Sequence, residues 1–220
     1  DYLKRFSSKE MYYKVIRTIG IGESDLETKL MPVINNQSDP TIATYAKEGE
    51  CALRVASQRD TAEMAKYAVD EMIEMIDGLI GEYIYSYDDD ELNQVVVHQL
   101  QRRRLWLSSA ESCTGGMFAS CITDVAGASS VFAEGFVTYS VEAKSEILGI
   151  DTAVIDKFSV VSGEVAVLMA DGARRKSKSD ISVSITGYAG PEADEGRENG
   201  NAFIGYSCGG KLGNKRGFIE

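Results

Sequence analysis

The sequence predicts an α/β domain over residues 91–220, preceded by a small α+β domain over residues 1–90. The stretch Tyr87-Asp88-Asp89-Asp90 is typical of a short acidic linker. Expected strands and helices follow one another in a different order before and after this stretch. The charge also differs: residues 1–90 hold 10 Lys and Arg against 18 Asp and Glu, a net charge of −8, whereas residues 91–220 have a net charge of −3. We therefore expect two domains, the first the more acidic.

The first domain is expected to follow a β-α-β-α-β order. Ser24 and Glu27 are spaced as a capping box that begins the first helix. The expected elements are a strand at 11–19, a helix from 24 to 31, a strand at 51–56, a helix at 61–79 and a strand at 83–87.

The second domain is expected to alternate strands with amphipathic helices. Arg102-Arg103-Arg104 suits the negative pole of the first helix, although an anion site is an alternative. The expected helices are at 94–103, from 117, from 140 to 148 and at 164–175, and the expected strands are at 105–107, 134–139, 181–186 and 202–207.

The stretch Glu111-Ser112-Cys113-Thr114-Gly115-Gly116 places a hydroxyl where an apolar strand turns into a helix. The backbone N–H groups of Thr114, Gly115 and Gly116 then lie at a helix N-terminus, where they lack intrahelical partners. Acyl transfer requires at least a nucleophile and nearby N–H donors that stabilise the oxyanion. The alternative is that Ser112 is the N-cap of the helix, a common role of serine.

A second stretch, Val137-Thr138-Tyr139-Ser140-Val141-Glu142-Ala143-Lys144, offers a base. With Ser140 as N-cap, Tyr139 and Lys144 occupy the two positions that a hydrophobic staple brings into contact. Lysine has a free pKa of about 10.4 and acts as a base only where its surroundings favour the neutral amine. Lys144 would then take the proton of Ser112, with Tyr139 either relaying the proton or orienting the base. The alternative is a surface lysine that packs its stem on a tyrosine.

Three of these residues follow or end expected strands, namely Ser112, Tyr139 and Thr186. Open α/β sheets bind ligands beyond the carboxyl ends of their strands, so one crevice is expected to hold all three. The glycines at positions 115, 116, 187 and 190 permit close approach of the backbone to a mononucleotide phosphate, which a helix N-terminus attracts. Their alternative role is in tight turns alone.

Both stretches, followed by V-S-G-E-V-A (161–166) and I-T-G-Y-A-G-P (185–191), resemble the C-terminal domain of the competence/damage-inducible protein CinA family. In many members this domain is a nicotinamide mononucleotide deamidase. The resemblance implies a three-layer α/β/α domain with a mixed sheet, and a homodimer. It also implies a Ser–Lys amidohydrolase that forms nicotinate mononucleotide and ammonia without a metal, in pyridine nucleotide salvage. Matched position by position, Ser112 is the nucleophile, Lys144 the general base and Tyr139 its partner. Because they are expected to border the same crevice, Thr114, Gly115, Gly116, Thr186 and Gly187 are expected to contact the substrate.

The chain departs from the family pattern near the expected pocket. Val141 stands where the family usually has Asn, and Glu192-Ala193-Asp194-Glu195 replaces a glycine-rich run. A family arginine in a later G-x-R segment has no counterpart before Glu220. These departures motivate a second hypothesis, a catalytically silent nucleotide-binding or assembly module, which predicts binding without turnover. Because the chain starts at Asp1, we expect a fragment of a longer protein; family members carry an additional N-terminal domain that acts on a pyrophosphate nucleotide.

The first domain resembles the KH-like middle module of the same family, in which R-x-x-G-I-G-E-S (Arg17–Ser24) introduces a helix. Nucleic-acid binding is not expected, because RNA-binding modules need a clamp such as GXXG and a basic face, whereas Glu23 and Asp25 follow these glycines. The G-x-G here lacks the third glycine of a dinucleotide fingerprint. A spacer between domains or a dimer contact is the expected role.

Composition narrows the remaining classes. The four cysteines, at positions 51, 113, 121 and 208, show no CxxC spacing, and His98 is the sole histidine, so neither a zinc site nor a cofactor is expected. Cys113 is expected to be a small buried residue rather than a reactive thiolate. Neither a membrane-length apolar run nor a signal-peptide pattern is present, and we expect a cytoplasmic protein whose partner is a small nucleotide.

Overall fold

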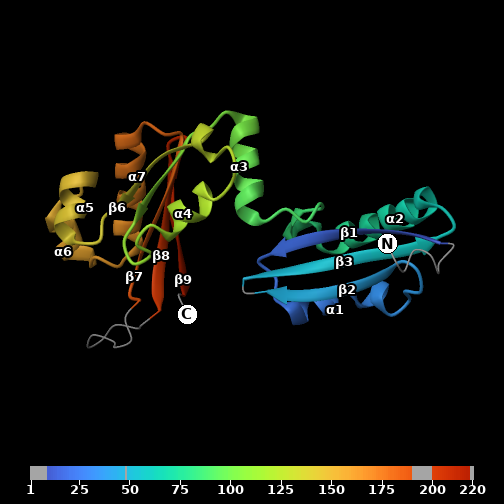
Figure 1. Cartoon of the computed structure of the whole chain (residues 1–220). Helices are drawn as coiled ribbons and strands as arrows, with labels where there is room; N and C mark the ends of the chain where they lie inside the picture. The colour runs from blue at the N-terminus through green and yellow to red at the C-terminus, as the bar shows by residue number, and fades with distance from the viewer. Residues whose placement is uncertain (1–8, 48, 190–199, 219–220) are drawn as a thin grey trace. The chain divides into compact units, whose positions relative to one another are not determined.

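The computed structural model describes residues 9–47, 49–189 and 200–218 (Figure 1). Contacts divide the chain into two compact units, Asp1–Val95 and Val96–Glu220. The division falls inside helix α3 (Leu92–Arg103), a few residues after the expected linker. Each unit has its own hydrophobic core.

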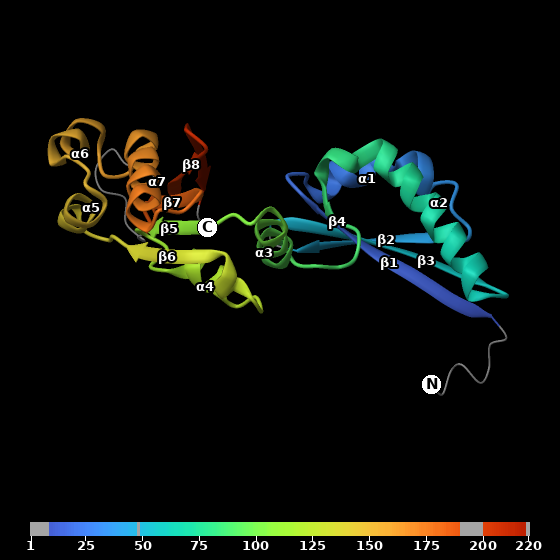
Figure 2. The ribbon, with the colours of Figure 1, turned by 90° about the horizontal axis from the view of Figure 1, so that it is seen from above.

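The first unit is an antiparallel sheet covered on one face by two helices (Figure 2). The strand order is β2-β3-β1-β4, and β1 and β3 pair along their whole length. Leu26 and Ile76 bring the two helices onto the same core as Ile16 and Leu53 of the sheet. The elements are β1 (Glu10–Ile19), α1 (Glu23–Ile34), β2 (Thr41–Lys47), β3 (Glu50–Arg59), α2 (Ala62–Ile80), η2 (Gly81–Tyr83) and β4 (Ile84–Ser86).

Two expectations for this unit are wrong. Helix α1 has Gly22 as its N-cap and no side-chain cap, so Ser24 and Glu27 form no capping box. Strand β2 was not predicted from its sequence, in which only Ile42 is a buried apolar residue. Its pairing with β3, from Thr41↔Ala56 to Lys47↔Glu50, stabilises a strand that the pattern of apolar residues in its sequence does not predict.

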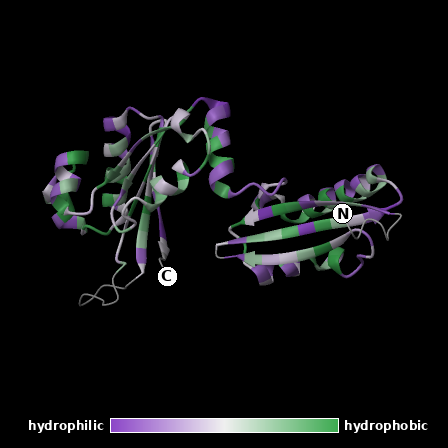
Figure 3. Cartoon of the chain, viewed as in Figure 1, coloured by the Kyte–Doolittle hydropathy of each residue, from purple (hydrophilic) through white to green (hydrophobic). Residues whose placement is uncertain are grey.

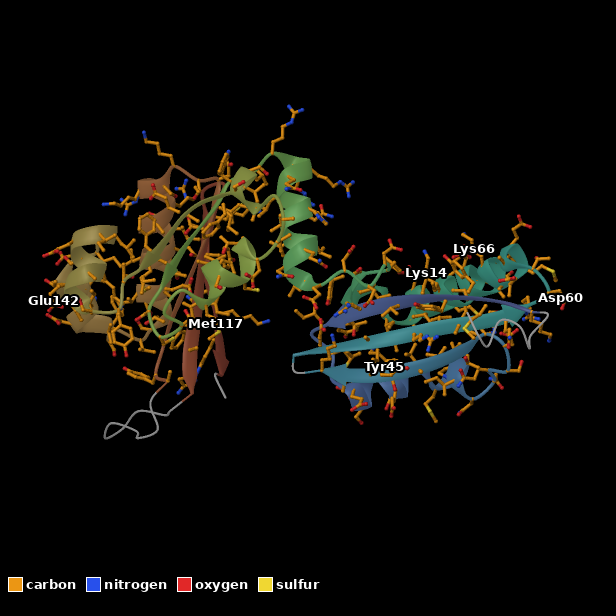
Figure 4. The ribbon with its side chains drawn as sticks, viewed as in Figure 1. Lys14, Tyr45, Asp60, Lys66, Met117 and Glu142 are labelled. Atoms are coloured by element: carbon orange, nitrogen blue, oxygen red, sulfur yellow. The ribbon has the colours of Figure 1, made fainter. Side chains whose placement is uncertain are left out.

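The acidic stretch predicted as a linker is bound to the first unit. Arg17, which is buried, donates to both Asp89 and Glu50, and the N–H of Asp89 donates to the carbonyl of Val15 at 3.1 Å. Lys14, labelled in Figure 4, lies 3.7 Å from Asp88. The negative charges of this stretch are thus partly neutralised within the unit.

The second unit has a mixed sheet with the strand order β6-β5-β7-β8-β9. Strand β5 is parallel to β6 and β7, whereas β7–β8 and β8–β9 are antiparallel. The elements from α3 onward are β5 (Leu107–Glu111), α4 (Met117–Thr123), η3 (Ala128–Ser130), β6 (Phe132–Val137), α5 (Val141–Leu148), α6 (Thr152–Phe158), α7 (Gly163–Ser177), β7 (Ile181–Gly187), β8 (Asn201–Cys208) and β9 (Lys211–Phe218).

Helices cover both faces of this sheet, which confirms the three-layer α/β/α prediction. On one face α3 and α4 contribute Val97 and Ile122 to a core with Leu107. On the other face α5, α6 and α7 surround a second core that includes Met169. Figure 3 shows the amphipathic character of α3, whose residues are green and purple in turn.

Helix α7 lies unusually close to the sheet. A Cβ on Gly205 of β8 would lie 2.3 Å from the Ala166 carbonyl oxygen, and Ser184 of β7 donates to the same carbonyl at 2.5 Å. Small residues are therefore required at these positions. This packing fixes the loop before α7, which borders the site described below.

The expected elements of this unit are confirmed apart from four details. The first strand spans Leu107–Glu111 rather than 105–107, and the second spans Phe132–Val137 rather than 134–139. Helix α6 and strand β9 were not predicted. Strand β9 is polar, yet the turn at Gly209-Gly210, both with positive φ, joins it to β8 as a hairpin, and this glycine pair is the signal that would have revealed it.

Candidate active site

Ser112 lies directly after β5 and does not cap a helix. Its N–H donates to the Ile185 carbonyl of β7 at 2.9 Å, which continues the parallel pairing of the two strands, and the residue is 7% exposed. The N-cap of α4 is Gly116, in a left-handed conformation with φ 105°. The N-cap alternative for Ser112 is therefore excluded, and its hydroxyl is available for another contact.

Lys144 reaches that hydroxyl from α5. Ser140 caps this helix by accepting from the N–H of Ala143 at 3.1 Å, as predicted, and this places Lys144 one turn inside the helix. The Lys144 side chain is 0% exposed, and its Nζ lies 3.0 Å from Ser112 Oγ. Nζ also donates to the carbonyl oxygens of Thr138 at 2.7 Å and Tyr139 at 3.1 Å.

The surroundings of Lys144 favour the neutral amine. Among the described residues, none of the ion pairs with a carboxylate includes its Nζ. Burial lowers the pKa of Lys144, with a smaller opposing effect from Cys113. A neutral amine has two N–H donors and one lone pair. When the amine is neutral, the carbonyls of Thr138 and Tyr139 accept its two N–H groups, and its lone pair can take the hydroxyl proton of Ser112, as a general base requires.

Tyr139 contacts Lys144 differently from the expectation. The bond to Nζ comes from the Tyr139 carbonyl rather than from its phenol, and the side chain is 74% exposed at the rim of the pocket. The staple that would bring the phenol onto the amine therefore does not account for the contact. The main-chain turn between β6 and α5 holds the base.

The free N–H groups also differ from the prediction. The N–H of Gly115 donates to the Ser112 carbonyl at 3.1 Å, and that of Gly116 donates to Glu111 Oε2 at 3.2 Å, so neither is free. The N–H groups of Cys113 and Thr114 act on the Cys113 sulfur instead, where hydrogen bonding lowers the pKa of the thiol against the larger effect of burial. Within the described residues these two amides have no carbonyl or carboxylate acceptor, and of the two residues Cys113 lines the pocket described next.

A pocket of about 310 Å³ opens beside Ser112. The predicted residue Gly187 borders Cys113 closely, since a Cβ there would lie 3.1 Å from Cys113 Sγ. The hydroxyl of Thr186 donates to the Val160 carbonyl at 3.1 Å and so stabilises the wall. The lining residues are Ser112, Cys113, Tyr139, Val160, Val161, Thr186, Gly187, Tyr188 and Ala189.

The sequence also singled out Val141, the stretch Glu192–Glu195 and Cys113. Val141 packs against the apolar core around Met169, and the stretch Glu192–Glu195 lies outside the described residues. Burial raises the pKa of Cys113, so it stays a thiol at neutral pH. In the ranges that the structure covers, no three His, Cys, Asp or Glu side chains are grouped to hold a metal ion.

The sequence reasoning missed two parts of the site. Glu111 was quoted within the motif without a role, and the loop at Val160 and Val161 was not expected in the pocket. Met117 begins α4, the helix that follows Ser112, and Glu142 lies in the first turn of α5, the helix that carries Lys144; both residues are labelled in Figure 4. None of the helices in the described part of the chain is long and apolar enough to cross a membrane.

Comparisons with known proteins agree with this architecture. Residues 89–217 match the CinA C-terminal domain, and residues 13–86 match the damage-inducible protein CinA KH domain. A CinA superfamily protein from Escherichia coli has a TM-score of 0.57 at 32% identity, covering 59% of this chain and 76% of that chain. A competence/damage-inducible protein from Agrobacterium tumefaciens has a TM-score of 0.55 at 34% identity, covering 57% and 77%.

Relatives of known sequence match across both units. A putative competence-damage inducible protein from Caldicellulosiruptor saccharolyticus is 46% identical over 93% of this chain and 50% of its own length. A protein of the same name from Bacillus subtilis is 40% identical over 95% and 50%. The chain thus spans about half the length of the curated relatives it matches. With both domain models and these relatives in agreement, the chain belongs to the CinA family.

Proposed function

We propose that the second unit is an amidohydrolase that converts nicotinamide mononucleotide to nicotinate mononucleotide and ammonia. The observation that carries this proposal is the 3.0 Å contact between Ser112 Oγ and the fully buried Lys144 Nζ. The substrate follows from the resemblance of the motifs, in which this pair carries out deamidation. A pocket of about 310 Å³ is at the small end of ligand sites and suits the carboxamide ring with part of the nucleotide.

The first half of the reaction forms an acyl-enzyme. Lys144 takes the Ser112 proton while Oγ bonds to the carboxamide carbon, and the carbonyl oxygen becomes an oxyanion. The N–H groups of Cys113 and Thr114 are the donors that stabilise this oxyanion, since those of Gly115 and Gly116 are occupied. The C–N bond then breaks, and Lys144 returns its proton to the nitrogen, which leaves as ammonia.

The second half reverses the roles. A water molecule gives a proton to Lys144 and bonds to the acyl carbon, the ester bond to Oγ breaks, and Ser112 recovers its proton. One amide and one water give one carboxylic acid and one ammonia. The proposed steps use side chains and N–H groups of this chain together with water. We also propose the homodimer that the resemblance implies, which light scattering of the complete protein would measure.

Ammonia release from nicotinamide mononucleotide by the complete protein that contains this chain tests the proposal. Ser112→Ala is expected to lower kcat by a factor of at least about 10³, as loss of a nucleophile does in hydrolases. Ser120→Ala is the matched control, because Ser120 is an exposed serine of α4. Activity that survives in Ser112→Ala removes the nucleophile. Substrate binding without turnover in the wild type favours the silent nucleotide-binding module instead.

A further inference from the structure

Glu111 is a buried carboxylate that directly precedes the nucleophile. It is the last residue of β5, and it is 1% exposed. Its Oε2 accepts from Thr114 Oγ1 at 2.7 Å, from Gly116 N at 3.2 Å and from Phe118 N at 2.9 Å. Its Oε1 accepts from Ala119 N at 2.9 Å. Four donors therefore converge on one side chain.

This arrangement compensates the buried charge without a cation. Among the described residues, none of the Lys or Arg side chains forms an ion pair with Glu111. Three of its four donors are backbone N–H groups at the start of α4, where the helix dipole favours negative charge. The N-cap residue Gly116 has no side chain to satisfy these groups, so Glu111 takes that role from five positions upstream.

The same bonds fix the turn that carries Ser112. On one side the N–H of Ser112 is bound to the Ile185 carbonyl of β7. On the other side the turn is tied to Glu111 through Thr114 and Gly116, and it is closed by the bond from Gly115 N to the Ser112 carbonyl. These bonds fix the main chain on both sides of Ser112 and thereby restrict the position of its hydroxyl.

Glu111 also decides which amides face the pocket. By binding Gly116 N, it turns that donor toward itself and away from any ligand. The N–H groups of Cys113 and Thr114 are not among the donors that Glu111 binds, and Cys113 lines the pocket.

We infer that Glu111 is a positioning residue for the reaction: by binding the start of α4, its carboxylate holds Ser112 within reach of Lys144 and leaves the Cys113 and Thr114 amides for the oxyanion. This inference rests on the proposed amidase function. Glutamine is the sharpest substitution, because Glu111→Gln keeps the shape but turns an NH₂ group toward N–H donors.

The complete protein serves for the test, with two readouts. The first is steady-state deamidation of nicotinamide mononucleotide, in which Glu111→Gln is expected to lower kcat by about 10²-fold with little change in KM, the loss seen when one transition-state interaction is removed. The second is the rate at which a fluorophosphonate labels Ser112, which is expected to fall at least about tenfold and does not depend on the identity of the natural substrate.

Controls separate positioning from general stability. Ser120→Gly weakens α4 on its exposed face and leaves the turn untouched, so kcat and labelling are expected to stay at wild-type values. Thr114→Val removes a single donor to Glu111 and is expected to give a smaller loss than Glu111→Gln. Glu111→Asp keeps the charge and is expected to restore part of the kcat. Thr114→Val and Glu111→Asp keep the inference testable should Glu111→Gln fail to fold.

The outcomes distinguish this inference from the proposed function. If Glu111→Gln keeps the wild-type labelling rate and kcat, the inference alone is overturned. The inference alone is also overturned if Ser120→Gly lowers kcat and labelling as much as Glu111→Gln does. A wild type that is labelled at Ser112 but does not deamidate the nucleotide overturns the proposed substrate, and the inference then stands or falls on the labelling rates. A wild type that is not labelled at Ser112 overturns both.

Discussion

Replacing Lys144 with methionine is expected to flatten the dependence of folding stability on pH. The amine is fully buried, and burial lowers its pKa from the ordinary value of 10.5. In the unfolded chain the same amine keeps that ordinary value. Between the two pKa values the unfolded state therefore binds one proton more than the folded state, so the free energy of unfolding rises with pH.

The expected slope is about 1.4 kcal/mol per pH unit for one proton. It begins at the folded pKa of Lys144 and ends near the unfolded pKa, and below the folded value the two states bind equal numbers of protons. The absolute stability of Lys144→Met at a single pH is less informative, since the carbonyls of Thr138 and Tyr139 lose a donor, at a cost of about 1–3 kcal/mol each. The difference in slope isolates the buried amine.

Urea unfolding of the wild type and Lys144→Met, followed by circular dichroism at a series of pH values from the neutral range upward, measures this slope. The series stops below pH 9.0, the ordinary pKa of Cys51 and Cys113, because burial raises the pKa values of these two thiols and their contribution has the opposite sign. Lys157→Met is the matched control, because Lys157 is an exposed lysine of α6. Equal slopes in the wild type and Lys144→Met would refute the argument that Lys144 is neutral in the fold.

Three further substitutions test the pocket. Tyr139→Phe will change KM rather than kcat, because its carbonyl still holds Lys144; a kcat loss as large as that of Lys144→Met contradicts this. Gly187→Ala will lower stability by about 1–3 kcal/mol, because the new Cβ crowds the Asn201 carbonyl oxygen and the Cys113 sulfur. Gly217→Ala, with nothing within 4 Å of the new Cβ, will not; thermal unfolding compares the two variants. Thr186→Val leaves the Val160 carbonyl without its donor, so it will lower the free energy of unfolding by about 1–3 kcal/mol and raise KM. Equal KM values in Thr186→Val and the wild type would show that this hydrogen bond does not shape the pocket.

Much of the site is predictable because its residues follow local rules. Ser140 caps α5 as serine commonly does, and this cap places Lys144 at a fixed position in the helix. The carboxyl ends of β5, β6 and β7 meet at one edge, which brings Ser112 to the same pocket as Thr186. Local patterns and the known behaviour of parallel sheets are sufficient for these placements.

Other features depend on contacts that a sequence pattern does not contain. Glu111 binds residues three to eight positions ahead across an irregular turn, a spacing that no capping rule describes. Residue 139 supplies a carbonyl where its phenol was expected, because the turn after β6 points the main chain at the amine. Strand β9 is formed by pairing with β8 rather than by its own apolar residues. In each case tertiary contacts decide what composition leaves open.

One proton links stability and chemistry in this site. The folded pKa of Lys144 marks the pH at which the unfolding free energy begins to rise, and it is also the midpoint at which kcat/KM of the free enzyme rises if the neutral amine is the base. The two measurements are independent, since one follows unfolding and the other follows ammonia release. Their coincidence would assign the catalytic base to Lys144, whereas a kcat/KM midpoint well removed from the onset of the stability slope would assign it to another group.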